Sequence, residues 1–256
     1  MDISLNEIKK GILAYAEAIQ KFNKFDLQKY FLLVFLLLFI FLFPVMIMDA
    51  FMYLFSIILP FSKSIKYESL FAQFMASISG FFLLLVLSPV FSLISEKVTA
   101  KLQGKTYHFS STQLIKDILR GIKITLRNLI YEYLFIALIS ILLYLSPKNS
   151  ISNIMGNILL ILVTSYYYGF TLLDYALENH RFSYKKSLNF VKNNKGIAIG
   201  LGLVYYIIIS TNDLPFVENI LGHFTIYITT FGEAIIVFIG VIAASILVSR
   251  KLKNPK

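Results

Sequence analysis

The chain has 256 residues, of which 57% are hydrophobic, 24 are Lys or Arg and 14 are Asp or Glu. Ordinary globular domains are only about 45–50% apolar, and the stretch 69–95 contains 27 consecutive residues without a charged side chain. A helix crosses the bilayer core with about 20 apolar residues. The composition therefore excludes a soluble domain and predicts a helical membrane protein. Because Cys is absent, disulfides, thiolate metal sites and a cysteine nucleophile are also excluded.

The distribution of Lys and Arg around the apolar runs predicts the topology. When the uncharged runs are treated as membrane spans, 21 of the 24 cationic residues fall on one side, the exceptions being Lys63, Lys66 and Lys148. Cytoplasmic loops hold an excess of Lys and Arg because moving these charges across the bilayer is unfavourable. We therefore expect a multi-span protein with both termini in the cytoplasm. The net charge of +10 then reflects topology rather than binding to nucleic acid.

The N-terminal segment predicts an amphipathic helix over residues 4–22. Its apolar side chains recur at steps of three and four residues, which places them on one helical face: Leu5, Ile8, Ile12, Ala16, Ile19 and Phe22. We expect this helix to lie on the inner leaflet, and the alternative is a solvent helix packed on a soluble partner. We expect no signal peptide, since the apolar run that follows residue 29 is too long for one.

Two long apolar segments, 30–59 and 69–94, predict membrane-spanning helices joined by a short outer loop at 61–68. Pro44 and Pro89 lie inside them and can bend them, because Pro lacks an N–H and clashes with the preceding turn. Residues 95–128 then form a cytoplasmic segment with a second helix that begins near Thr112. A basic stripe at a membrane surface usually meets anionic lipid head groups, and this helix carries one: Lys116, Arg120, Lys123 and Arg127.

The remaining apolar runs predict two helical hairpins. The first pairs 133–147 with 151–173, the second pairs 196–210 with a run that ends at Val248, and a cytoplasmic segment, 176–195, joins them. The 15 uncharged residues of 133–147 are at the lower limit for a crossing. Each hairpin therefore either crosses the bilayer or enters it halfway, with its backbone ends covered by protein or water. The predicted fold class is an all-α integral membrane protein with one polytopic domain, 1–256, built from long transmembrane helices, two shorter hairpins and amphipathic cytoplasmic helices.

Three stretches, taken in order, resemble one family of membrane proteins. They are 11–31, 89–104 with the sequence PVFSLISEKVTAKLQG, and a motif that contains Asp174-Tyr175, Asn179-His180 and Tyr184. With the order of helices and hairpins, they resemble the CysZ sulfate permeases and the related etoposide-induced membrane proteins. The resemblance implies an oligomeric protein of the bacterial inner membrane that passes sulfate inward.

The resemblance also implies an anion-binding set at the first and second long helices: Gln28, Lys29, Ser92, Leu93 and Glu96. Helix entrances favour anions, although a Lys in the position of Lys29 more often reaches the head groups. For Ser92 and Glu96 the alternative is helix capping with an ion pair. The chain departs from the family twice, because Ser92 replaces Gly in a Gly-Leu-x-x-Glu motif and Gln28-Lys29 replaces adjacent arginines. Without the guanidinium fork that fits a tetrahedral oxyanion, a substrate other than sulfate is a further possibility.

Polar residues in or beside the apolar runs form a second group of candidates for pore or structural roles. Charges inside a membrane are unfavourable unless they are paired or functional. For Glu132 and Asp174 we favour structural pairs with Lys or Arg of the basic segments. Glu233 is the best candidate for a group that faces a cavity, where it would take a proton or bind a cationic partner. Asn179 and His180 belong to the family-like motif, and His180 is expected to stabilise a loop, since no second metal ligand lies three or four residues away.

Enzymatic chemistry has no support in the sequence. No phosphate-binding loop, zinc motif or nucleophile elbow is present, so we expect no catalytic residues, no metal and no cofactor. The leading hypothesis is a homo-oligomeric channel or transporter, surrounded by membrane lipids, that passes sulfate or a related oxyanion into the cytoplasm. The alternative hypothesis is a non-transporting membrane scaffold that binds anionic lipid or a protein partner.

Overall fold

The computed structural model describes residues 4–58, 87–104, 111–146, 150–210 and 225–253, and no strand occurs within these ranges. The all-α prediction is confirmed. Most of the predicted span 69–94, the outer loop 61–68 and the turn before Pro215 lie outside the described residues. Residues 87–103 are helical, and the other elements are α1 (Leu5–Lys21), the 3-10 turn η1 (Asn23–Phe25), α2 (Gln28–Ile58), α4 (Ser111–Leu145), α5 (Ser150–Asn179), α6 (Tyr184–Asn193), α7 (Lys195–Ser210) and α9 (Thr225–Lys253).

Within the described residues, three helical segments are long and apolar enough to cross a membrane: Leu119–Leu145, Ser150–Asn179 and Thr230–Lys253. At ~1.5 Å per residue, the first extends for about 40 Å, which exceeds the bilayer core of about 30 Å. The α4–α5 hairpin is therefore long enough for a full crossing. The 16 residues of α7 extend for only about 24 Å, whereas α9, its partner in the second predicted hairpin, has 29 residues.

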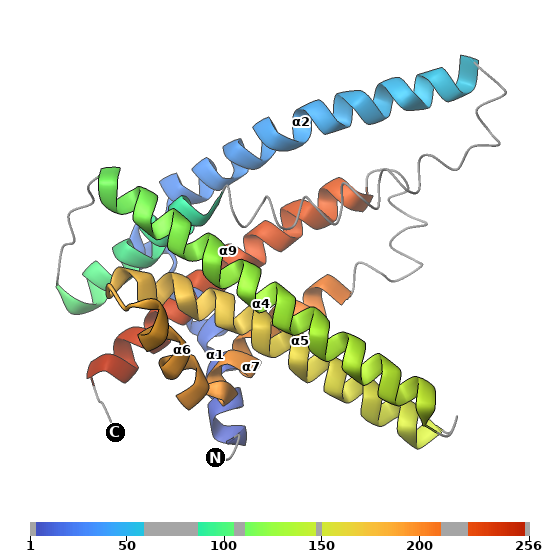
Figure 1. Ribbon diagram of the computed structural model, residues 1–256. Coiled ribbons are helices and arrows are strands. Elements are labelled where there is room, and N and C mark those ends of the chain that lie inside the picture. The colour runs from blue at the N-terminus through green and yellow to red at the C-terminus, as the bar shows by residue number, and fades with distance from the viewer. Residues whose placement is uncertain (1–3, 59–86, 105–110, 147–149, 211–224, 254–256) are drawn as a thin grey trace.

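Helix α4 joins two parts that the sequence treated separately. The basic helix that begins near Thr112 and the short run 133–147 form one element of 35 residues, Ser111–Leu145. No Pro or Gly lies between Arg127 and Tyr133, so nothing there ends the helix, and counting only uncharged residues underestimated its length. In Figure 1, α4 and α5 lie side by side as a hairpin that extends away from the other helices.

Helices α5 and α7 touch through their backbones. A β-carbon added to Gly202 would overlap the carbonyl oxygen of Ser165, and one added to Gly169 would overlap the carbonyl of Ala198. Glycine at both positions lets the helix axes come closer than any other residue would allow. Small residues serve this purpose in membranes, where helices associate by van der Waals packing rather than by exclusion of water.

Helix α1 packs on α7 in a similar way, and it confirms the predicted helix 4–22. A β-carbon at Gly11 would lie 2.7 Å from the carbonyl oxygen of Ile197, and the Tyr15 hydroxyl donates a hydrogen bond of 3.0 Å to the carbonyl of Leu201. The buried face is made of small residues and Tyr15, not of the large apolar residues that the periodicity selected. Four members of the predicted apolar face are exposed: Leu5, Ile12, Ala16 and Ile19.

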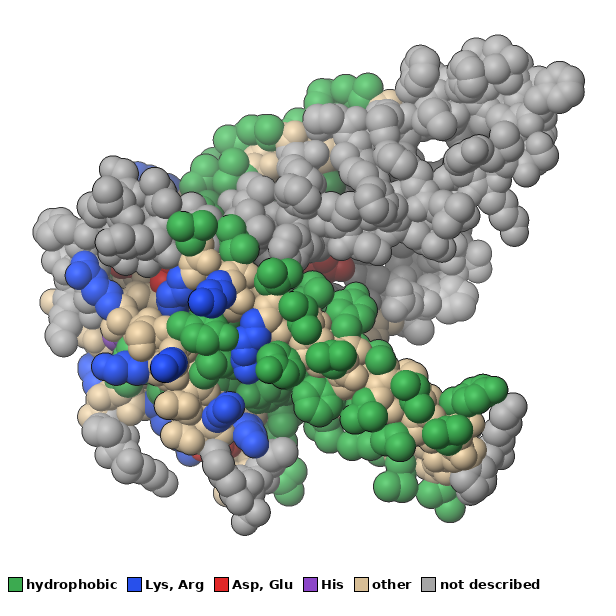
Figure 2. All heavy atoms as spheres, viewed as in Figure 1, with side chains coloured by type: hydrophobic (Ala, Val, Ile, Leu, Met, Phe, Trp, Pro, Cys, Tyr) green, Lys and Arg blue, Asp and Glu red, His purple; other side chains and the backbone are tan. Residues whose placement is uncertain are grey.

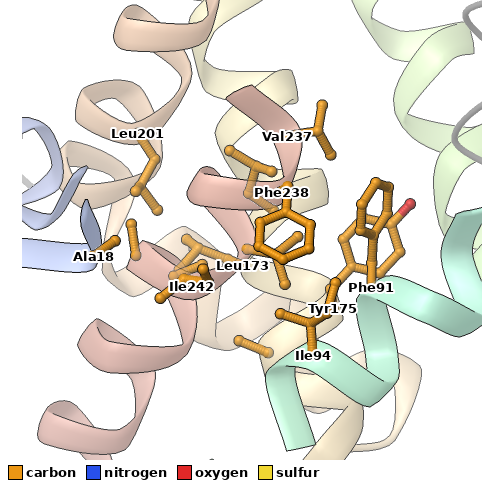
Figure 3. Close-up of a cluster of buried hydrophobic side chains, with 14 of the residues drawn as sticks. Ala18, Phe91, Ile94, Leu173, Tyr175, Leu201, Val237, Phe238 and Ile242 are labelled. Atoms are coloured by element: carbon orange, nitrogen blue, oxygen red, sulfur yellow. The ribbon is translucent and has the colours of Figure 1, made fainter. Parts of the chain in front are cut away.

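Helix α9 lies at the centre of the hydrophobic core. Its Phe238 packs edge to face on Phe31 of α2, with ring centroids 5.4 Å apart. On another side of the core, Phe91 and Tyr175 bring the helical stretch 87–103 against α5, with centroids 5.5 Å apart. Figure 3 shows the cluster to which α1, α5, α7, α9 and the 87–103 stretch all contribute.

Ion pairs tie the first helix to the end of the last one. The carboxylate of Glu17 accepts from Lys21 at 2.5 Å and also from Arg250, and Lys251 donates to Glu7 at 3.2 Å. The two ends of the chain consequently lie at the same side of the molecule (Figure 1).

Helix α5 ends in a Schellman motif. The Arg181 N–H donates to the carbonyl of Glu178 at 2.8 Å, and the Phe182 N–H donates to that of Leu177 at 3.3 Å. Arg181 holds the left-handed position of the motif with φ 52°. That position normally takes Gly, because a β-carbon there is unfavourable by roughly 1 kcal/mol. The family-like motif at the end of α5 is thus closed by a strained turn.

We expect Arg181→Gly to stabilise the fold by about 0.5–1 kcal/mol, since removing the β-carbon relieves strain while the freer unfolded chain offsets part of the gain. Thermal unfolding in detergent measures the effect. Arg181→Ala, which removes the charge and keeps the β-carbon, should give no such gain. An equal gain in both variants would assign the effect to charge instead.

The stability contributed by Glu17 should depend on pH. Burial raises the pKa of Glu17, but hydrogen bonds and charge from Lys21 and Arg250 outweigh burial and leave the pKa below its ordinary value of 4.5. A carboxyl group with a depressed pKa stabilises the fold above its unfolded pKa, and this contribution is lost as pH falls through the folded pKa. We expect Glu17→Gln to lower the melting temperature at about pH 7, with the difference closing below about pH 4. A difference that widens in acid would contradict this assignment.

Candidate functional site

The first part of the predicted anion-binding set lies at the start of α2. Gln28 and Lys29 are both exposed, and the Gln28 amide donates to the side-chain oxygen of Asn23 at 3.4 Å. In the turn just before them, Asp26 pairs with Lys101 at 2.7 Å. The hydrogen bond and charge of Lys101 hold the pKa of Asp26 below its usual value. This pair places the entrance of α2 beside the end of the 87–103 helical stretch.

The second part of the set has a different environment. Ser92 is 2% exposed, and its hydroxyl donates to the side-chain oxygen of Asn179 at 3.5 Å. Leu93 and Glu96 are half-buried on the same helical stretch. The predicted set therefore combines an exposed cation at the surface with a buried hydroxyl that already has an acceptor. The structure also brings Ser92 to Asn179, two residues that the sequence singled out separately.

A buried ion pair joins α4, α5 and α6. One Arg120 nitrogen donates to the Asp174 carboxylate and to the Ser187 hydroxyl, both at 2.7 Å. The side chains are 16% and 6% exposed for Arg120 and Asp174, so both charges are largely removed from solvent. The expected pairing of Asp174 with a cation of the basic segment is confirmed. Sequence reasoning missed Ser187, because nothing distinguishes it from other polar residues until α6 is seen to bury it.

The expected ion pair of Glu132 is not found among the described residues. Its carboxylate accepts a hydrogen bond from Thr164 on α5, and no described Lys or Arg pairs with it. The second carboxylate in this region, Glu233 of α9, is half-buried. The phenol of Tyr168 interacts electrostatically with both carboxylates, and its ring packs on Tyr205 of α7 with centroids 4.4 Å apart. Two carboxylates and two phenols thus gather between four helices.

The sequence contains a pattern that could have pointed to these Tyr residues, but the pattern has more than one explanation. Tyr occurs three times in succession on α5 and twice in succession on α7, within otherwise aliphatic runs. Aromatic residues of this kind are common both in cores and at membrane interfaces, so the repeats alone did not indicate a polar cluster.

His180 lies in the capped end of α5. The residue is half-buried, and its ring is 6.5 Å from that of Phe182, measured between centroids. Among the described residues, no group of three or more His, Cys, Asp or Glu side chains is placed to hold a metal ion. His180 therefore sits where it can support the turn between α5 and α6.

A pocket between α2 and α9 is apolar and does not coincide with any candidate polar residue. An oxyanion needs hydrogen-bond donors or cations to replace its water, and this lining supplies none: Leu32, Phe35, Leu36, Phe39 and Phe231. The pocket is suited to a hydrocarbon chain instead.

Comparison with known proteins identifies the family of this chain. A family described as Sulfate transporter CysZ/Etoposide-induced protein 2.4 matches residues 13–217. Proteins named Sulfate transporter CysZ from three strains of Vibrio cholerae serotype O1 are each 30% identical to this chain over 135 residues, which is 52% of this chain and 51% of theirs. The chain thus spans about half the length of the curated relatives it matches.

The family match includes every candidate residue described above except Glu233 and Phe231, and it extends from α1 to beyond α7. With a match over most of its length and an all-helical fold, this chain belongs to the Sulfate transporter CysZ/Etoposide-induced protein 2.4 family.

Proposed function

We propose that the protein is a channel or transporter, not an enzyme, that passes sulfate or a related oxyanion into the cytoplasm across the bacterial inner membrane. The family match over 13–217 is the observation that carries the proposal, and the name of the curated relatives supports sulfate as the substrate. The cationic excess of the chain is compatible with attraction of an anion.

Lys29 is the proposed entrance cation. It lies in the first turn of α2, where the helix dipole also favours negative charge, and no described acidic side chain pairs with it. Lys101, which lies nearby, is already paired with Asp26. A single exposed ammonium with the Gln28 amide beside it binds an oxyanion weakly, and conduction requires binding that is weak enough to allow release.

The helical stretch 87–103 is proposed to form the adjacent wall of the path. Ser92 is held by Asn179, and Leu93 and Glu96 lie beside it at half-buried positions. The carboxylate of Glu96 repels an anion, which would hinder tight binding at this point. In this role Ser92 and Asn179 hold the wall in place rather than contact the anion.

The proposal also includes the orientation of the chain in the membrane and its oligomeric state. Both termini lie at one side of the molecule (Figure 1), which supports a cytoplasmic location for both under the charge bias. We propose a homo-oligomer, in which further copies cover exposed apolar faces that lipid does not. A reporter fused after Asn194, at the end of α6, should report the cytoplasm.

Purified protein in liposomes should take up labelled sulfate faster than protein-free liposomes. Lys29→Ala should slow uptake about three- to tenfold, the effect of losing ~0.7–1.4 kcal/mol of attraction. The matched control is Lys24→Ala, which removes an exposed cation from η1 and should change uptake little. Absence of uptake above protein-free liposomes would instead support the non-transporting scaffold.

We propose that the Arg120–Asp174 pair is structural. Arg120→Gln and Asp174→Asn should each lower stability by about 3 kcal/mol, because each leaves a buried charge without its partner. The double variant Arg120→Met with Asp174→Leu should recover most of this loss, as measured by thermal unfolding. Sulfate uptake per folded molecule should survive in the double variant. A stable double variant without uptake would show that the pair takes part in transport.

A further inference from the structure

The basic stripe of α4 contains cations in two different situations. Arg120 is buried and paired with Asp174. Lys123 and Arg127, one and two turns further along, have no acidic partner within the part of the chain that the structure describes. Lys123 is exposed and Arg127 is half-buried. These two residues, the Lys123–Arg127 pair, therefore keep their charge available at the surface.

The surroundings of the pair hold both side chains in place. The guanidinium of Arg127 lies 4.9 Å from the ring centroid of Tyr131 and 5.9 Å from that of Phe170, and one of its nitrogens donates to the side-chain oxygen of Asn128 at 3.1 Å. The Lys123 ammonium lies 5.4 Å from the ring centroid of Tyr184 on α6. Rings that flank a cation in this way fix its position without neutralising it.

A buried donor lies beside this pair. Asn128 is only 3% exposed, and its amide nitrogen has no hydrogen-bond partner among the described residues. The side-chain oxygen of Asn128 already accepts a hydrogen bond from Arg127, so what the side chain lacks is an acceptor for its amide N–H groups. An acceptor-rich group bound to Arg127 would supply the missing partner, and a buried polar group without a partner is otherwise unfavourable.

The same helix is apolar and open on its outer face. Only 11% of the most apolar window in Leu119–Leu145 is buried inside the chain. Exposed large apolar side chains continue from the pair along α4: Leu126, Leu129, Ile130, Leu134, Leu138, Ile141 and Leu142. Figure 2 shows the boundary directly, with basic residues gathered next to the region where the apolar side chains of the α4–α5 hairpin begin.

We propose that the Lys123–Arg127 pair binds the phosphate of an anionic phospholipid in the leaflet on the cytoplasmic side, with the acyl chains lying along the exposed apolar face of α4. A phosphodiester is a tetrahedral oxyanion that accepts two hydrogen bonds from one guanidinium. Tyr131 and Tyr133 are 45% and 63% exposed, and tyrosines are enriched at the head-group level. A free oxyanion would use the cations but not the apolar face, so the whole surface fits a lipid better.

The test uses the full chain purified in detergent and three added ligands: phosphatidylglycerol, phosphatidylcholine and inorganic phosphate. Phosphatidylglycerol should raise the melting temperature and remain bound in native mass spectrometry, because a ligand that binds only the folded state stabilises it. The variant Lys123→Gln with Arg127→Gln should bind phosphatidylglycerol about thirtyfold more weakly, as expected for the loss of two basic residues near an anionic head group.

The matched control is Lys9→Gln with Lys10→Gln, which removes the same charge from exposed positions on α1 and should leave binding nearly unchanged. Arg127→Lys keeps the charge but removes the two-point geometry of the guanidinium. It should cause an intermediate loss of phosphatidylglycerol binding, and it tests the proposal even if the double variant folds poorly. The proposal is overturned if both double variants lose binding equally, if phosphatidylcholine protects as well, or if inorganic phosphate alone reproduces the effect. The outcome does not depend on whether sulfate is transported.

Discussion

The fold depends on the direct backbone contact that α7 makes with two other helices. Gly169 and Gly202 allow it on the side of α5, and Gly11 and Gly200 allow it on the side of α1. Lipid tails are as apolar as the helices, so burial of apolar surface gives little net attraction between helices, and close packing must supply it. Because α5 is fixed by this contact, Asp174 and the other polar residues near its end are fixed with it.

The fold divides the Lys and Arg residues of this chain into two sets, according to whether they have an acidic partner. Some cations have carboxylate partners that hold elements together, as Arg120 holds α4 to α5 and Lys101 holds the turn before α2 to the 87–103 stretch. Others, among them Lys29 and the Lys123–Arg127 pair, keep their charge without an acidic partner in the described residues. An electrostatic function of this protein, whether toward a transported anion or toward lipid, is best sought in the second group. The pairing of each cation matters more here than the total charge.

Sequence reasoning succeeded where one physical factor acts alone. The bounds of α1 follow from helical periodicity, and the ion pair of Asp174 follows from the instability of a lone carboxylate beside a basic segment. It failed where two factors compete. Periodicity identified Leu5, Ile12 and Ile19 as an apolar face that lies on the leaflet, and these residues are exposed, but it did not identify the neighbouring face of small residues that packs on α7, which close packing between helices favours. For Glu132, a hydroxyl on α5 replaced the expected cation, and only the tertiary arrangement shows that Thr164 is close enough.

The short length of α7 has a consequence for the response of the protein to bilayer thickness. The start of α7 is clamped to α1 by glycine contacts, and α1 exposes a broad apolar face that the sequence places at the leaflet surface. The packed end of α7 is then held in place relative to α1. A change in the thickness of the surrounding lipid is expected to act on the opposite end of α7, near Ser210, more than on the end that α1 holds.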